Sequence, residues 1–372
     1  MSNTNMESLY PEFWFGAFDK LDMGILNAQN LVSRDVEKML ADKGDTVNVP
    51  LTPDMGKADD WTPGVSISKT NVVQKTVPVV LQHSKRKTIA LTDKELSLSP
   101  YDLIEKYGVG MAKSILDAVN ESIYDELRCT DNIIAGAITQ DKITDAKVAL
   151  DNKRAMANRF MLMDSTDLGV LAKESKKANE YGSNQALREG FVDRLSGFDI
   201  YQNSVIEKYT PADVAGAVDA PGGVTYPAGT TEMVVDTFAD ALNPIKKGVA
   251  FKFYGHDTQY VALSTTQDTD GNTIGIKFFP ATTVNVADNV VITATSTRSA
   301  IGFLPSAVAF AARPYSLGDG IGIRKSVNII NGLPIRSMVW TDSDTTNLNV
   351  QFDILYGVQV VAPQRIVRID TT

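Results

Sequence analysis

The segment from Ser99 to Arg128 carries the longest uninterrupted helical pattern in the sequence. Ser99 suits a helix cap, and Pro100 suits the first helical position because its missing N–H would be unpaired there in any case. Seven apolar residues spaced three or four apart would share one side of this helix: Ile104, Tyr107, Met111, Ile115, Val119, Ile123 and Leu127. Such a helix would span about 40 Å, so we expect an extended surface to pack along its apolar side.

The pattern changes to alternating apolar and polar residues between Thr46 and Thr92, with interrupting prolines and glycines. This alternation predicts a long irregular β-hairpin. Acidic residues lie in its tip region, 52–63, and basic residues lie on its returning limb. A solvent-exposed face explains such charges, and docking of the two limbs on a second copy of the chain is the alternative. The candidate intersubunit contacts on this hairpin are Asp59, Asp60, Trp61, Lys85, Arg86 and Lys87.

The N-terminal segment from Tyr10 to Leu40 has an interrupted helical pattern with more apolar surface than so short a segment buries by itself. It can fold back on its own domain or reach a neighbouring subunit, and the sequence leaves both open. Phe13 and Trp14 are therefore added to the candidate intersubunit contacts.

The middle of the chain mixes helices and strands, which predicts an α+β fold. We expect a helix over 141–157, a strand over 159–163, a helix beginning at Asp164 or Ser165 and ending at Lys173, and a hairpin over 189–205 that turns at Ser196 and Gly197. Short strands without helices follow the Gly, Ala and Pro-rich segment 216–229 and extend to Ala294. They predict a small inserted barrel or sandwich. Beyond it, we expect a short apolar helix from Leu304 to Arg313 and then further strands.

Composition and motifs favour a structural protein over an enzyme. A formal charge of −9 gives no general basic surface for nonspecific nucleic-acid binding. Cys129 is the single cysteine, so an intrachain disulfide is excluded. The two histidines, His83 and His256, lie far apart in sequence and have no ligands at metal-binding spacing. We predict no catalytic, cofactor-binding or metal-binding residues, and the N-terminus has no secretory signal and the chain no membrane-spanning segment.

The order of these elements resembles the major capsid proteins of tailed bacteriophages, in the branch with an inserted β-barrel. The segments that carry the resemblance are LVSRDVEKML, KGDTVNVP, KRKTIALTDKELS, LSGFDIYQNS, FLPSAVAFAARP and VQFDILYGVQVVAPQRIVRI. The resemblance implies a Hong Kong 97-type capsid fold with an N-terminal arm, an extended β loop, a long spine helix and an axial domain. It implies an arm over 1–43, the extended loop over 44–96, a peripheral domain with the spine helix over 97–160, a first axial part over 161–224, the inserted barrel over 225–297, a second axial part with a helix at Pro305–Pro314 over 298–340, and C-terminal strands returning to the peripheral domain over 341–372.

The resemblance also implies a function. The chain would self-assemble as pentamers and hexamers into the icosahedral head of a double-stranded DNA phage, after synthesis in the bacterial cytoplasm. Scaffolding and portal proteins would be partners, the enclosed DNA would not be bound sequence-specifically, and no membrane or cofactor would take part. Two alternatives stay open: an encapsulin-like shell around a protein cargo, and a β-rich carbohydrate-binding or carbohydrate-active protein suggested by Trp61, Tyr254 and Tyr260.

Overall fold

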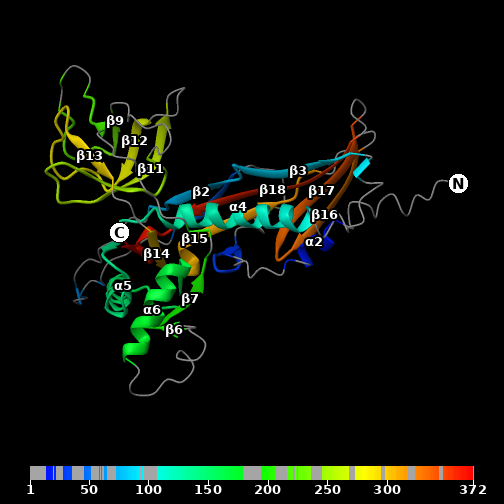
Figure 1. Ribbon diagram of the computed structural model, residues 1–372. Helices are drawn as coiled ribbons and strands as arrows, with labels where there is room; N and C mark the ends of the chain where they lie inside the picture. Colours follow the sequence, from blue (N-terminus) through cyan, green and yellow to red (C-terminus); the bar gives the residue numbers. More distant parts are fainter. Residues whose placement is uncertain are drawn as a thin grey trace.

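The computed structural model of the chain has a mixed α+β architecture with three sheets and a separate two-stranded hairpin (Figure 1). The small sheet that contains β11 and β13 (yellow) stands at one end of the molecule, and the sheet packed on α4 extends toward the other end. The structure describes residues 14–19, 21, 28–35, 46–51, 58, 60, 63–64, 73–92, 94–95, 107–178, 194–203, 205–206, 216–220, 223, 225–235, 245–267, 273–294, 298–316, 323–342 and 347–371.

A long helix and one antiparallel sheet form the largest hydrophobic core. The elements are α4 (Val109–Leu127), β3 (His83–Leu91), β15 (Val308–Arg313), β16 (Ile323–Ile330), β17 (Leu333–Thr341) and β18 (Leu348–Val360). β18 is central, with β3 on one edge and both β17 and β15 on the other. Its alternate residues from Val350 to Val358 are buried in the same cluster as the apolar stripe of α4. The prediction of an extended surface along the helix is therefore confirmed.

The apolar stripe of α4 is buried from Met111 to Leu127, whereas Tyr107 is 38% exposed and lies outside the core. The predicted helix start at Ser99 falls outside the described residues. Two short elements, α2 (Gly16–Asp19) and η1 (Ala28–Asn30), represent the N-terminal helical segment within the described residues. The rings of Phe15 and Phe18 lie 5.9 and 5.3 Å from that of Phe352, so this segment folds back on its own core.

A second sheet, with two helices packed on it, lies beside the first. In sheet order its strands are β4 (Ile133–Ala135), β19 (Ile366–Thr371), β14 (Arg298–Phe303), β5 (Arg159–Met163), β7 (Phe198–Gln202) and β6 (Arg194–Leu195), and its helices are α5 (Gln140–Asn152) and α6 (Ser165–Ala178). The predicted strand 159–163 and the hairpin are confirmed. Both predicted helices are present, but the first ends at Asn152 instead of residue 157 and the second continues past Lys173 to Ala178. Ser196 and Gly197 both have positive φ, at 49° and 85°, as a tight two-residue hairpin turn requires.

The third sheet has six strands, and we call it the small barrel below. In order it comprises β8 (Gly216–Ala217), β13 (Val291–Ala294), β10 (Ala250–Phe253), β11 (Tyr260–Gln267), β12 (Thr273–Phe279) and β9 (Glu232–Val234). A bridge between Val218 and Val235 joins the two end strands, so the hydrogen-bonded path closes on itself. The rings of Phe251, Phe253, Tyr260 and Phe278 fill its interior. β8 belongs to this sheet although it precedes residue 225, the start expected from the resemblance.

The predicted helix over Leu304–Arg313 is wrong. Only η6 (Pro305–Ala307) is helical, and the following residues form β15. A strand whose two faces are both covered has no polar alternation, so its continuous apolar run cannot be told from a buried helix by periodicity.

The grouping of 298–340 into one axial part also needs correction. β14 pairs with β5 and β19 in the second sheet, whereas β15, β16 and β17 belong to the sheet packed on α4. The C-terminal strands divide in the same way: β18 lies against α4, and β19, after η7 (Pro363–Arg365), returns to the second sheet.

Candidate functional site: the hairpin, the edge strand and the polar sheet face

A two-stranded hairpin, β1 (Thr46–Pro50) and β2 (Thr76–Val80), packs on the face of β15 and β18 that points away from α4. It rests on a hairpin seat formed by the small residues Ala309, Ala311 and Gly357. A Cβ added to residue 357 would collide with the main-chain oxygen of Val80. The carbonyl carbon of Val80 and the Cα of Leu81 would lie 2.9 and 3.3 Å from the added Cβ. Any larger residue at 357 would therefore displace the hairpin.

Apolar residues of the hairpin continue beyond the seat. The pair Val47 and Val79 is buried against it, and the next pair on the same face, Val49 and Val77, is only half-buried. Val73, still farther along the limb, is 69% exposed. Valines left uncovered by their own chain are suited to burial by a second molecule.

β3 is an edge strand. It pairs with β18, and its other edge has no ladder partner among the described residues. The predicted basic residues Lys85, Arg86 and Lys87 are all exposed on it. The register places Lys85 and Lys87 on the α4 side of the sheet and Arg86 on the opposite face, beside Asp353.

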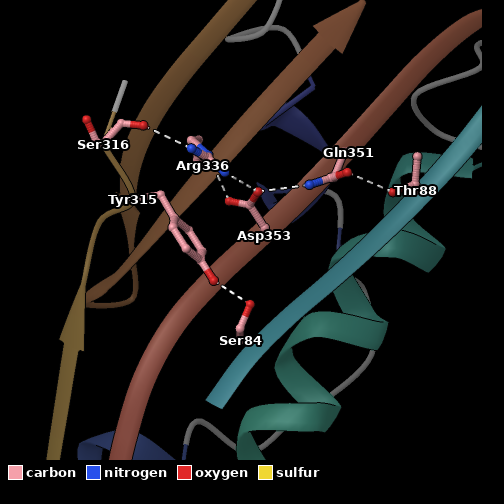
Figure 2. A network of polar contacts seen from close by, with 7 residues as sticks. All are labelled: Ser84, Thr88, Tyr315, Ser316, Arg336, Gln351 and Asp353. Carbon is pink, nitrogen blue, oxygen red and sulfur yellow. Dashed lines mark hydrogen bonds and ion pairs between the residues drawn. The ribbon is translucent and has the colours of Figure 1, made fainter. Parts of the chain in front are cut away.

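A row of polar side chains crosses the sheet face that points away from α4 (Figure 2). Thr88 Oγ1 donates to Gln351 Oε1 at 3.0 Å, and Gln351 Nε2 donates to Asp353 Oδ2 at 2.9 Å. Arg336 donates through two nitrogens to the two oxygens of Asp353, at 3.0 and 2.7 Å. The row thereby links β3, β18 and β17.

Residues just after β15 complete the network. Arg336 donates to the main-chain oxygen of Ser316 at 2.9 Å and lies 4.6 Å from the ring centroid of Tyr315. The hydroxyl of Tyr315 in turn bonds that of Ser84 on β3. Asp353 is 3% exposed, and a charge buried this deeply needs a well-placed partner. Arg336 supplies that partner and holds the chain after β15 through Ser316, while the bond between Tyr315 and Ser84 links that chain to the edge strand.

The structure brings together only some of the predicted contact residues. Asp60 is exposed, while Phe13, Asp59 and Trp61 lie outside the described residues. Trp14 is 5% exposed and belongs to the core around α4, which favours the interpretation that its segment folds back. His83 stacks on Tyr356 at 5.1 Å, and burial, with the nearby Lys85 and Lys247, lowers its pKa.

The Arg336 and Asp353 pair was not predicted from the sequence. A signal was nevertheless present, because each is the lone charge in its strand: Asp353 in QFDILYG and Arg336 in LPIRSMVW. Isolated charges at such positions are retained in a folded core when they pair with each other.

Carboxylates near the C-terminal end of α4 make stability depend on pH. Burial raises the pKa of Asp125 from 3.8 to about 6, an effect that Arg128 opposes and Glu121 reinforces. The folded state thus holds this proton more tightly than the unfolded state does, so stability falls as the pH rises from 3.8 to about 6.

We expect Asp125→Asn to raise the free energy of unfolding by about 1 to 3 kcal/mol near pH 7.5, because the buried charge is removed. Near pH 4 the gain should shrink to a small fraction, since the parent carboxyl is already protonated. Urea unfolding at the two pH values measures both. Asp257→Asn, at an exposed residue between β10 and β11, controls for loss of a negative charge, and an equal gain of Asp125→Asn at both pH values would contradict the prediction.

Two searches of the described residues had negative results. No helix there is long and apolar enough to cross a membrane. No group of three His, Cys, Asp or Glu side chains there is placed to hold a metal ion.

Comparison with solved structures shows that the mixed α+β fold of the chain is similar to that of phage proteins, one of them from a capsid. A chain from Mycobacterium phage Che8 aligns with a TM-score of 0.53 at 16% identity, over 92% of this chain and 89% of that chain. A chain of the capsid structure of the cyanophage P-SCSP1u aligns with a TM-score of 0.51 at 10% identity, over 89% and 84% of the two chains. No protein-family model and no curated protein matches the sequence.

Proposed function

We propose that the chain is the major capsid protein of a tailed double-stranded DNA bacteriophage and assembles into its icosahedral head. The observation that carries this proposal is the likeness over nearly the whole chain to phage structures, one of them a capsid. The role is structural rather than enzymatic. In this proposal, α4 and its sheet form the peripheral domain, and the sheet of β14 and β5 forms the axial domain.

Contacts between copies should involve the parts of the subunit that its own chain leaves uncovered. The apolar limb of the hairpin beyond the seat and the exposed basic residues of β3 are such parts. We place Asp59, Asp60, Trp61, Lys85, Arg86, Lys87 and Phe13 at contacts between subunits. Trp14 is left out, because its own core already covers it.

Pentamers and hexamers of the chain would make up the shell, with scaffolding and portal proteins as further partners. The shell would enclose DNA without reading its sequence. The net charge of −9 suits this role, because an acidic container does not bind the phosphate backbone tightly.

Sedimentation and negative-stain electron microscopy of the expressed chain test the proposal. We expect closed shells, formed by the chain alone or with the scaffolding protein of its phage. A chain that stays monomeric or dimeric under all these conditions would overturn the proposal.

Replacing residues 52–63 with a flexible Gly and Ser linker tests the role of the hairpin. We expect the thermal transition of the subunit to be unchanged and the yield of shells to fall by at least about tenfold, the effect of losing about 1.4 kcal/mol per contact. A control chain with a linker of equal length added after its last residue should assemble like the parent. Loss of the subunit's own thermal transition would instead assign this segment to the core.

A further inference from the structure

The small barrel has a hydrophobic core of its own, separate from the two clusters that hold the remaining sheets together. It meets the rest of the subunit where the loop before β10, residues 245–249, reaches the C-terminal end of α4. Gly248 in this loop has a φ of +80°, and a Cβ there would lie 2.8 Å from the Cβ of Arg128. The loop and the helix end therefore approach each other too closely for any other residue at 248.

Arg368 of β19 lies at this meeting point and is fully buried. Its Nη1 donates to the main-chain oxygens of Arg128, at 2.9 Å, and Gly248, at 2.6 Å. Its Nε and Nη2 donate to the two oxygens of Asp370, at 2.8 and 2.6 Å. One guanidinium thus contacts the end of α4, the barrel loop and β19 together.

The bonds made by Arg368 belong to a larger buried polar network. The main-chain oxygen of Arg128, directly after α4, also accepts a hydrogen bond from the N–H of Thr130 at 2.9 Å. Asp370 also accepts from the hydroxyl of Ser299 at 2.7 Å, and the main-chain oxygen of Ser299 accepts from the hydroxyl of Tyr124 at 2.8 Å. The aspartate is therefore held in place on both sides.

A second polar link lies next to Gly248. Lys247 forms an ion pair with Glu126 of α4, whose side chain is buried. Together with the bonds of Arg368, this pair fixes the barrel loop at two successive residues. A flexible tether would need neither the buried guanidinium nor the close backbone approach.

We propose that Arg368 and Gly248 form a rigid joint that holds the small barrel at one orientation on the C-terminal end of α4. The barrel then moves with the helix instead of swinging on its connecting segments. This inference concerns a single subunit and stands whether or not copies assemble.

Spin labels on the barrel and the helix test the joint in the full chain. Cysteines replace Lys277 on β12 and Glu121 on α4, both exposed, and electron–electron resonance gives the distance distribution between the labels. The native Cys129, which is buried next to Arg128 of the joint, is replaced by alanine in every chain, so that only the two introduced cysteines carry labels.

We expect one narrow distribution in the parent. Arg368→Lys keeps the charge but loses the planar fork, and Gly248→Ala keeps every polar group but disrupts the close approach. Each should broaden the distribution by at least about twofold. Arg365→Lys is the matched control, because Arg365 is exposed and donates to Ser306 Oγ at 2.8 Å away from the joint; it should match the parent.

Two outcomes would overturn the inference. A parent-like narrow distribution in both variants would mean that other contacts orient the barrel. Unfolding of the whole subunit by either variant, seen by circular dichroism, would mean that these residues support the common core and do not act as a joint between two stable parts.

Discussion

Replacing Arg336 with methionine is expected to lower the free energy of unfolding by about 3 to 5 kcal/mol, because it leaves the buried carboxylate of Asp353 without its partner. Gln351 would still donate one hydrogen bond to this carboxylate, which does not compensate a full buried charge. Denaturant unfolding of the parent and the variant measures the loss.

The double variant Arg336→Met with Asp353→Leu distinguishes the stability lost by leaving a buried charge unpaired from the stability lost by changing the packing. We expect it to recover most of the lost stability, since apolar replacements of a buried ion pair are often neutral or favourable. If Arg336→Met alone costs less than about 1 kcal/mol, as surface pairs do, then water reaches the carboxylate and the pair does not stabilise the sheet.

Gly357→Ala is the second change with a large expected effect. Its Cβ would collide with the main chain of β2 at Val80, and a backbone atom cannot rotate away as a flexible side chain can. We expect a loss of about 1 to 3 kcal/mol by overpacking. The yield of shells should fall by more than this loss of stability accounts for, because the hairpin would project from the subunit in a different direction. Unfolding and assembly assays on the same preparation give the two quantities.

Gly275→Ala is the matched control for this change. Gly275 is also a strand glycine, but the nearest atoms to a Cβ there are those of Thr266 at 3.6 Å, an ordinary contact. It should leave stability within about 0.5 kcal/mol of the parent or raise it slightly. Equal behaviour of the two variants would show that the seat accepts a methyl group.

Local sequence patterns predicted those helices and strands that have one buried side and one exposed side. The stripe of α4 and the strand 159–163 were identified because spacing and flanking residues reflect burial directly. The turn at Ser196 and Gly197 was identified from its chemistry. The run from Val308 to Ala312 was misassigned because α4 lies on one of its faces and the hairpin on the other, which removes the periodicity.

Strand partners were beyond the reach of these patterns. β14 and β15 are joined only by η6, yet they belong to different sheets, and no local feature marks the change. The polar row from Thr88 to Arg336 could not be predicted for the same reason, since its members come from strands that meet only after folding. The sequence predicted that the basic residues of β3 are exposed contacts, but it did not predict that Asp353 of β18 lies beside Arg86.

One edge of β3 has no ladder partner within the described part of the chain, which has a consequence for subunits that, in the proposed function, have not yet joined a shell. A strand of nine residues with one open edge can be a template for fibrous aggregation, since the N–H and C=O groups of that edge can pair with another extended chain. Three consecutive positive charges, from Lys85 to Lys87, repel an identical edge that approaches it. We expect this repulsion to disfavour edge-to-edge pairing between concentrated subunits.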